Sequence, residues 1–150
     1  MTGVRVGIVD VYVIRVLRTS WRVLVLRRAA GTRSTGSWET VHGRIEPGET
    51  PKQAAVREVE EEAGVRASVA GRLDDVVLAM GDEHQRIRYF LMAAVEETEA
   101  HEGRGVAWLS ASEAMERLLF PQAKATLQNA IKALKELYPG LYQDRYNTPP

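Results

Sequence analysis

The sequence predicts a single α+β domain, because alternating strand-like segments surround one well-capped helix and two helical segments close the chain. Its 150 residues are an ordinary length for one domain. Apolar residues make up 45% and charged residues 27%, as in typical globular proteins, so the composition favours neither disorder nor membrane insertion. We therefore expect one domain over residues 4–140 and a C-terminal tail at 141–150.

Two valine-rich segments near the start of the chain predict a β-hairpin. Residues 4–17 and 21–29 alternate roughly between apolar and polar side chains, with a turn around 18–20. The small and polar residues 30–37 predict a loop at the rim of a substrate site. A third, shorter strand is expected at residues 38–46, with the apolar side chains of Trp38, Val41 and Ile45.

The second half of the chain predicts another hairpin and then helices. Residues 67–80 and 85–97 are strand-like and flank a turn at Gly81 and Asp82, and residues 105–110 predict a last short strand. Residues 111–119 and 121–138 are helical in pattern, with a proline at the start of the second segment. Its apolar stripe consists of Ala123, Leu127, Ala130, Ile131, Ala133 and Leu134.

The segment between Thr50 and Gly64 carries the strongest helix signals in the chain. Thr50 is a preferred N-cap, Pro51 suits the first helical position, and Gln53 completes a capping box. Gly64 supplies the stop. At about 100° per residue the apolar side chains form a stripe that can dock on a sheet, made of Ala55, Val56, Val59 and Ala63.

Three glutamates share one side of this helix. Glu58, Glu61 and Glu62 are spaced i, i+3 and i+4, whereas Glu60 points elsewhere. Each like-charged pair costs roughly 0.2–0.5 kcal/mol on an isolated helix, and a hard cation such as Mg2+ or Mn2+ would offset that repulsion. The alternative is a solvated face relieved by Arg57 and by salt.

The residues upstream decide between these alternatives. Gly43 is followed after five residues by Glu49 and after seven more by "REVEEEAGV", which begins at Arg57. This is the Nudix box, G-x5-E-x7-R-E-U-x-E-E-x-G-U with U aliphatic, so residues 43–65 resemble the Nudix hydrolase superfamily. The order of the flanking elements also resembles the Nudix fold, in which a mixed β-sheet is sandwiched between helices (α/β/α).

The resemblance implies a hydrolase that uses Mg2+ or Mn2+ to cleave a phosphoanhydride of a nucleoside diphosphate linked to another moiety, with water attacking phosphorus. The implied metal ligands are Glu58, Glu61 and Glu62, joined by the backbone carbonyl of Gly43 and by Glu49 as further candidates. The implied catalytic residues are Glu61, Glu58, Arg57 and, as an extra ligand or general base before Trp108, Glu102. Arg57 and Glu49 are expected to orient the site through charge-assisted hydrogen bonds.

The substrate contacts are less specific in the sequence. Arg44 and Arg88 are candidates to hold phosphates and Trp38 to stack on a base, against the alternatives of a solvated strand residue and a core aromatic. The same alternatives apply to Arg86, Tyr89 and Phe90. The three histidines, His42, His84 and His101, are expected at the surface or in loops.

Charge and cysteine content restrict the partners. Twenty basic residues balance twenty acidic ones, so we expect neither nucleic acid nor a membrane as a partner. The absence of cysteine excludes disulfides and thiol catalysis, and it suits a cytoplasmic protein. It also disfavours the isopentenyl-diphosphate isomerase activity that the resemblance would allow, because that chemistry relies on a cysteine. We expect a small nucleotide or related diphosphate as the ligand, with a nucleoside triphosphate favoured, and a homodimer is possible by resemblance. The competing hypothesis is a catalytically silent domain that binds or senses nucleotides.

Overall fold

The structure is a computed structural model that describes residues 4–18, 20–28, 36–98 and 105–139. The predicted domain boundary at residue 140 lies outside these residues. In chain order the elements are β1 (Val4–Leu17), β2 (Ser20–Arg27), β3 (Trp38–Glu39), β4 (Val41–Arg44), α1 (Pro51–Ala63), β5 (Val65–Arg72), β6 (Val76–Met80), β7 (Glu83–Glu97), β8 (Val106–Leu109), α2 (Ala111–Arg117) and α3 (Pro121–Leu137).

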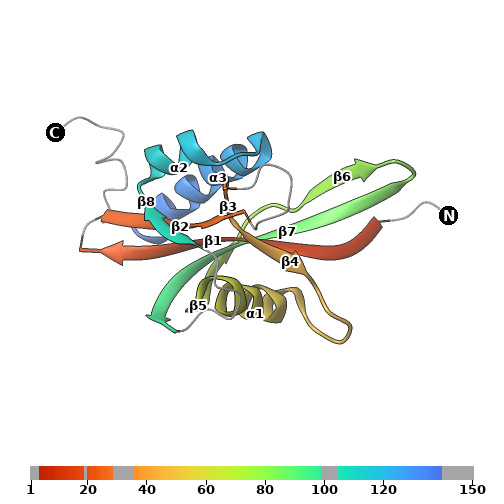
Figure 1. The fold of residues 1–150 in the computed structure, drawn as a ribbon, viewed down its shortest axis with the longest axis horizontal. Coiled ribbons are helices and arrows are strands. Elements are labelled where there is room, and N and C mark those ends of the chain that lie inside the picture. The colour runs from red at the N-terminus through yellow and green to blue at the C-terminus, as the bar shows by residue number, and fades with distance from the viewer. Residues whose placement is uncertain (1–3, 19, 29–35, 99–104, 140–150) are drawn as a thin grey trace.

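The strands form one eight-stranded mixed sheet (Figure 1). Its path runs β3-β2-β1-β7-β5, with β4 beside β1, β6 beside β7 and β8 beside β2. The long strands β1 and β7 pair in parallel, and every other described pairing of two strands is antiparallel. The predicted hairpins, β1–β2 and β6–β7, are both present.

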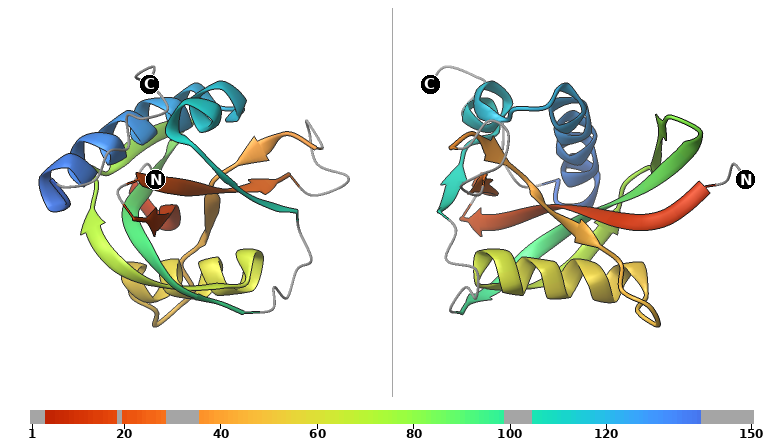
Figure 2. Two further views of the ribbon diagram at one scale, coloured as in Figure 1. Left: turned by 90° about the vertical axis from the view of Figure 1, so that its left-hand side faces the viewer. Right: turned by 45° about the vertical axis from the view of Figure 1, so that its right-hand side comes forward.

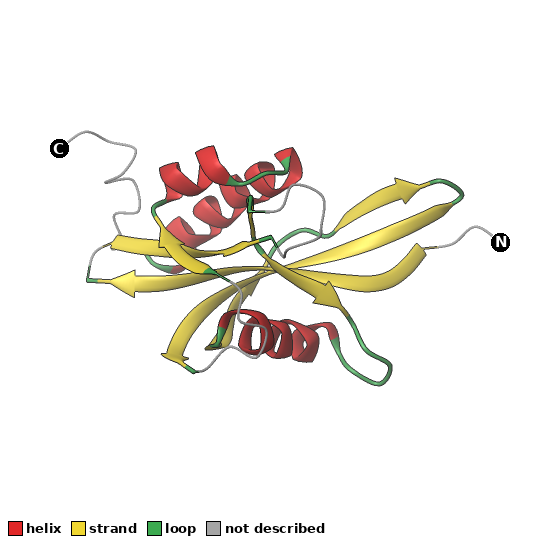
Figure 3. Ribbon diagram, viewed as in Figure 1, coloured by secondary structure: helices red, strands yellow, loops and turns green. Residues whose placement is uncertain are grey.

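Helices cover both faces of this sheet (Figures 2 and 3). α1 lies on one face, and α2 and α3 lie on the other. The alternation of β1 explains why both faces are apolar: Val9, Val11 and Val13 pack with α1, whereas Tyr12 and Ile14 pack with α3. The predicted mixed sheet between helices is therefore confirmed.

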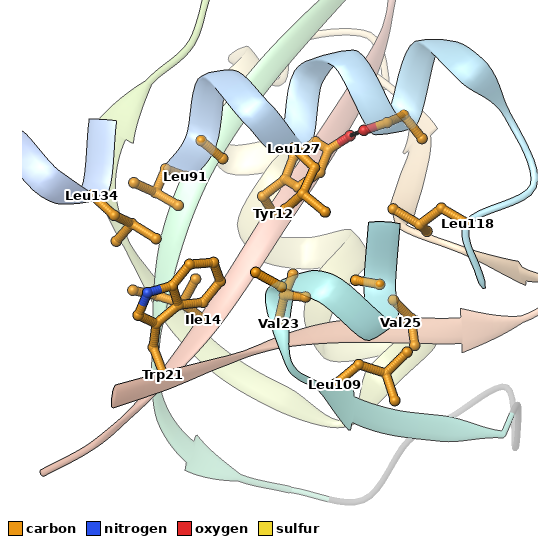
Figure 4. Close-up of a cluster of buried hydrophobic side chains, with 14 of the residues drawn as sticks. Tyr12, Ile14, Trp21, Val23, Val25, Leu91, Leu109, Leu118, Leu127 and Leu134 are labelled. Atoms are coloured by element: carbon orange, nitrogen blue, oxygen red, sulfur yellow. Dashed lines mark hydrogen bonds between the residues drawn. The ribbon is translucent and has the colours of Figure 1, made fainter. Parts of the chain in front are cut away.

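The core beneath α3 is anchored by one polar contact (Figure 4). Trp21, Leu127 and Leu134 are buried there together with the ring of Tyr12. The Tyr12 hydroxyl donates a hydrogen bond of 2.7 Å to the carbonyl oxygen of Ala123. This bond fixes the first turn of α3 over the middle of β1.

α1 begins and ends as the sequence predicts. The backbone N–H of Gln53 donates to the Thr50 hydroxyl at 3.1 Å, and the Gln53 side chain accepts from the Thr50 N–H at 2.9 Å. Gly64 adopts the left-handed conformation with φ 67°. The buried stripe differs slightly from the prediction, because Ala54 is fully buried and Val56 only partly.

Two predicted strands are each divided in the structure. Residues 38–46 form β3 against β2 and β4 against β1, because Thr40 carries the chain from one partner strand to the other. Residues 67–80 divide into β5 and β6, which both pair with β7. Arg72 pairs with Phe90 and Val76 pairs with Ile87. Between these pairs, residues 73–75 lie opposite only residues 88–89 of β7, and the one extra residue interrupts the ladder.

Across the described residues, none of the helices combines the length and the apolar character needed to span a membrane.

Candidate active site

Arg57 ties α1 to the loop that precedes it. Its Nε donates to Glu49 Oε2 at 2.8 Å and its Nη2 to Glu49 Oε1 at 3.0 Å, which makes a bidentate pair. Oε1 of Glu49 also accepts a hydrogen bond of 3.0 Å from the backbone N–H of Glu46. The hydrogen bond from Arg57 holds the pKa of Glu49 below its usual range, so this carboxylate is charged throughout the neutral range.

The same guanidinium reaches the glutamates of the helix. Nη1 donates to Glu58 Oε1 at 2.9 Å and to Glu61 Oε2 at 3.1 Å. Nη2 also donates to the backbone carbonyl of Arg44 at 2.9 Å. Arg57 therefore links α1, the loop after β4 and β4 itself, as expected for an orienting residue.

Gly43 and Glu58 lie in direct contact. A Cβ atom built on Gly43 would lie 2.2 Å from Cδ of Glu58, so only glycine leaves space for this carboxylate. Two of the three helix glutamates are buried, with 9% of Glu58 and 8% of Glu62 exposed. Burial raises the pKa of Glu58, an effect that Arg57 opposes and the charge of Glu61 reinforces.

The donor set suits a hard divalent cation. Glu58, Glu61 and Glu62 supply carboxylate oxygens from one side of α1, and Gly43 keeps the backbone of β4 open beside them. In the parts of the chain that the structure describes, no three acidic or imidazole side chains already converge on one point that could hold a metal. Instead, Glu58 and Glu61 turn toward Arg57, which offsets their mutual repulsion.

A cavity of about 250 Å³ opens on the opposite face of the sheet, under the start of α3. Aromatic and aliphatic side chains form most of its wall, and polar residues form the rest. The aromatic and aliphatic residues are Ile8, Trp38, Leu78, Ile87, Tyr89, Leu119, Phe120 and Ala123. The polar ones are Asp10, Glu39, Thr40, His42 and Gln122.

The strand β4 separates the two sites. Val41 and Gly43 face α1, where Val41 is part of the core and Gly43 contacts Glu58. His42, between them, lines the cavity together with Thr40. A short strand thus carries part of both sites on its two faces.

The predicted substrate residues divide between these faces. Trp38 lies in the cavity wall, with the Arg27 guanidinium 5.2 Å from its ring centroid. Arg88 is half-buried on β7 and, through its partner Val9, is in register with Gly43 on the α1 side. The Arg44 side chain is exposed, and its described contact with the cluster is made by the backbone carbonyl.

Several further residues can be placed. Tyr89 lines the cavity, whereas Phe90 is in the core under α1. His42 also lines the cavity; it lies in a strand and not in a loop, with 42% of its side chain exposed. Glu102, His101 and most of the loop at 30–37 lie outside the described residues.

The cavity residues were mostly missed from sequence. Asp10, Thr40 and the neighbouring Phe120 and Gln122 come from three places in the chain, and no short motif joins them. One signal was available: Asp10 is an acidic residue inside a valine-rich strand, in the alternation that places Tyr12 in the core. An acid at such a position marks a buried polar site.

Comparison with known proteins decides the family. The model of the NUDIX domain family matches residues 7–131. The chain belongs to the Nudix family. The prediction that it is a Nudix hydrolase is therefore confirmed.

The relatives of this Nudix protein include nucleotide hydrolases. It is 30% identical over 128 residues to the CTP pyrophosphohydrolase of Escherichia coli K12, which covers 83% of this chain and 92% of that protein. It is 33% identical over 89 residues to the 8-oxo-dGTP diphosphatase of the same organism, over 59% of this chain and 69% of that protein.

Solved structures agree with the fold. The solution structure of the E. coli ORF135 protein matches with a TM-score of 0.65 and 28% identity, covering 88% of this Nudix chain and 93% of that one. The crystal structure of the M. smegmatis Nudix hydrolase RenU matches with a TM-score of 0.71 and 21% identity, covering 89% and 88%.

Proposed function

We propose that this Nudix hydrolase cleaves a phosphoanhydride bond of a nucleoside triphosphate, or a closely related nucleotide, with the help of Mg2+ or Mn2+. The observation that carries the proposal is the cluster of Glu49, Glu58 and Glu61 around Arg57, next to the bare backbone of Gly43. Further support comes from the cavity across β4 and from relatives named as CTP and 8-oxo-dGTP hydrolases.

Each part of the cluster has a chemical task in this proposal. Glu58, Glu61 and Glu62 would hold the cation, with Glu49 and the Gly43 carbonyl as further candidates. When bound, the cation supplies charge neutralisation at the phosphates and activation of water. Arg57 keeps Glu58 and Glu61 on one side of the helix through its hydrogen bonds.

The remaining groups would receive the substrate. Arg88 faces the same side of the sheet as Glu58, and in this proposal it would contact the phosphates. Trp38 and the other aromatic residues of the cavity would stack on the base. Glu61, which has 42% of its side chain exposed, can reach solvent and so accept the proton of the attacking water, with Glu102 as the alternative acceptor.

The test is release of phosphate and pyrophosphate from nucleoside triphosphates, dinucleoside polyphosphates, ADP-ribose and sugar nucleotides, with and without Mg2+ or Mn2+. We expect turnover that depends on the metal and falls at least a hundredfold in Glu61→Gln. Glu60→Gln, on the same helix turn but outside the hydrogen bonds and ion pairs that the structure describes for Arg57, is the matched control and keeps its activity. Nucleotide binding without turnover on any compound would instead support the silent binding domain.

The cytoplasmic location and the homodimer stay predictions. The oligomeric state is measured directly by sedimentation or by scattering of the purified chain.

A further inference from the structure

Asp10 occupies an unusual place in the cavity. It lies in the middle of β1, opposite His42 on β4 and Tyr89 on β7. Its neighbours Val9 and Val11 are buried under α1, so the carboxyl group points to the face that carries the cavity. Across the described residues no arginine or lysine pairs with it, and the titratable side chains that act on it are those of His42 and Glu39.

Thr40 determines what this carboxyl group can offer a ligand. The Thr40 hydroxyl donates its single proton to Asp10 Oδ1. With that proton used, the Thr40 oxygen can only accept further hydrogen bonds, and an ionised carboxylate can only accept as well. The Asp10–Thr40 pair therefore presents acceptors to the cavity.

The other acid of the cavity is already engaged. Glu39 Oε2 accepts from Arg28 Nη1 at 3.1 Å and lies 3.8 Å from His42 Nε2. The Arg28 guanidinium offsets the charge of Glu39. Asp10 is thus the acidic group of the cavity with the greater need for a donor from a ligand.

The shape of the cavity narrows the class of donor. Trp38, Tyr89 and Phe120 give it flat aromatic walls, which suit a planar ring. Its volume of about 250 Å³ is below the ~300–1,000 Å³ of pockets that enclose whole drug-sized ligands, so it suits a base more than an entire nucleotide.

We propose that Asp10, with Thr40, selects nucleobases that carry an exocyclic amino group, by accepting a hydrogen bond from that amine. The inference rests on the proposed nucleotide hydrolysis and names the base class that the site prefers. A base that presents only a carbonyl oxygen or a hydrogen atom at that position leaves the buried acceptors unsatisfied and binds less well. Burial raises the pKa of Asp10 to about 6, which leaves most of it ionised at neutral pH.

The experiment compares nucleotides that differ at the amino group. GTP against ITP removes one amine, and CTP against UTP replaces an amine by an oxygen. We expect kcat/KM to favour the amino-bearing member about tenfold or more in the pair that is turned over faster. In Asp10→Asn that ratio falls at least fivefold, through KM rather than kcat, while turnover of the amine-free member is retained.

Two further variants serve as a control and as an alternative to Asp10→Asn. Asp74→Asn, an exposed acid outside the cavity, leaves the ratio unchanged. If Asp10→Asn does not fold, Thr40→Val takes its place as the test. This variant keeps the carboxylate but removes the hydroxyl that orients it, so we expect it to lower the ratio by a smaller factor. A ratio near one in the wild-type enzyme, or an equal ratio in wild type and these cavity variants, overturns the role of Asp10 and leaves the hydrolase proposal standing.

A second readout separates the two proposals. Binding of guanosine and inosine, and of cytidine and uridine, is measured without metal by titration calorimetry. A preference for the amino-bearing nucleoside that Asp10→Asn abolishes supports the inference even when turnover is absent. Equal binding within both nucleoside pairs overturns the role of Asp10, whereas a binding preference without turnover on any nucleotide counts against the hydrolase proposal alone.

Discussion

The carboxylate of Glu58 occupies the volume that a side chain at Gly43 would fill. A Cβ atom on Gly43 would come within 2.2 Å of Glu58 Cδ and 2.3 Å of its Oε1. The glycine is required by this contact and not by its own backbone, because Gly43 is not among the described residues with a positive φ. The Glu58 carboxylate of α1 can therefore take this position only because Gly43 of β4 has no side chain.

Gly43→Ala tests this relationship. The backbone tolerates alanine, so we expect a folded protein in which the Glu58 carboxylate is displaced, with kcat/KM at least a hundredfold lower. Steady-state kinetics with Mg2+ measure the effect, and thermal unfolding reports the fold. Gly105→Ala is the control, since its added Cβ would make only an ordinary 3.4 Å contact with Arg27. Full activity in Gly43→Ala would show that the Glu58 position is not needed.

Arg57→Lys keeps the positive charge but loses the guanidinium group that makes the bidentate pair with Glu49. One ammonium group cannot hold both oxygens of Glu49 and also reach Glu58, Glu61 and the Arg44 carbonyl. We expect a 10- to 100-fold loss in activity or in apparent Mg2+ affinity, as found for residues that orient metal ligands. A metal titration of activity measures it. Arg66→Lys, at an exposed pair with Glu96, changes neither quantity.

Asp10→Asn changes the dependence of stability on pH. The folded-state pKa of about 6 lies above the ordinary 3.8, so the folded protein binds the Asp10 proton more tightly than the unfolded chain does. Asp10 therefore destabilises the fold as the pH rises from about 4 through about 6, by on the order of 1–3 kcal/mol. The asparagine variant escapes this loss.

The measurement is the free energy of unfolding by denaturant at pH 4.5 and pH 7.5. The difference between Asp10→Asn and wild type moves in favour of the variant at the higher pH. Asp74→Asn, which is exposed, shows no such change. A pH-independent difference would mean that Asp10 titrates alike in both states.

Thr50→Ala removes the N-cap of α1. The Thr50 hydroxyl accepts the hydrogen bond of the Gln53 N–H, and its loss costs about 1 kcal/mol of stability. Chemical denaturation measures the cost. Lys52→Ala, exposed on the same turn, is the control. Ser110→Ala removes the equivalent cap of α2 and offers an independent comparison of the same motif.

The helix of the site was predictable because its signals are local. Thr50, Gln53 and Gly64 act within a few residues of the positions that they determine, and the spacing of Glu58 and Glu61 follows from helix geometry. The cluster around Arg57 was predicted as an orienting contact, and the structure adds the Arg44 carbonyl to it. That partner depends on the path of β4, which no pattern in α1 specifies.

The strand interruptions and the cavity depend on distant contacts. Thr40 ends one pairing and begins another only because β2 and β1 accept neighbouring parts of the chain. The alternating pattern at residues 38–46 is compatible with one strand or two. Asp10 and Phe120 line one cavity although 110 positions of sequence separate them, so the sheet and α3 must be placed before the cavity can be recognised.

The four residues of β4 have a consequence for changes in chain length. Because Val41 and Gly43 face the helix and His42 faces the cavity, inserting or deleting one residue there would exchange the two sets. A bulky side chain would then meet Glu58, while the cavity would lose its histidine. Such a change removes both sites at once, whereas the turn at Gly81 can lengthen without touching either. Insertion scanning would therefore find β4 among the least tolerant stretches of the protein, although it is among the shortest of the strands.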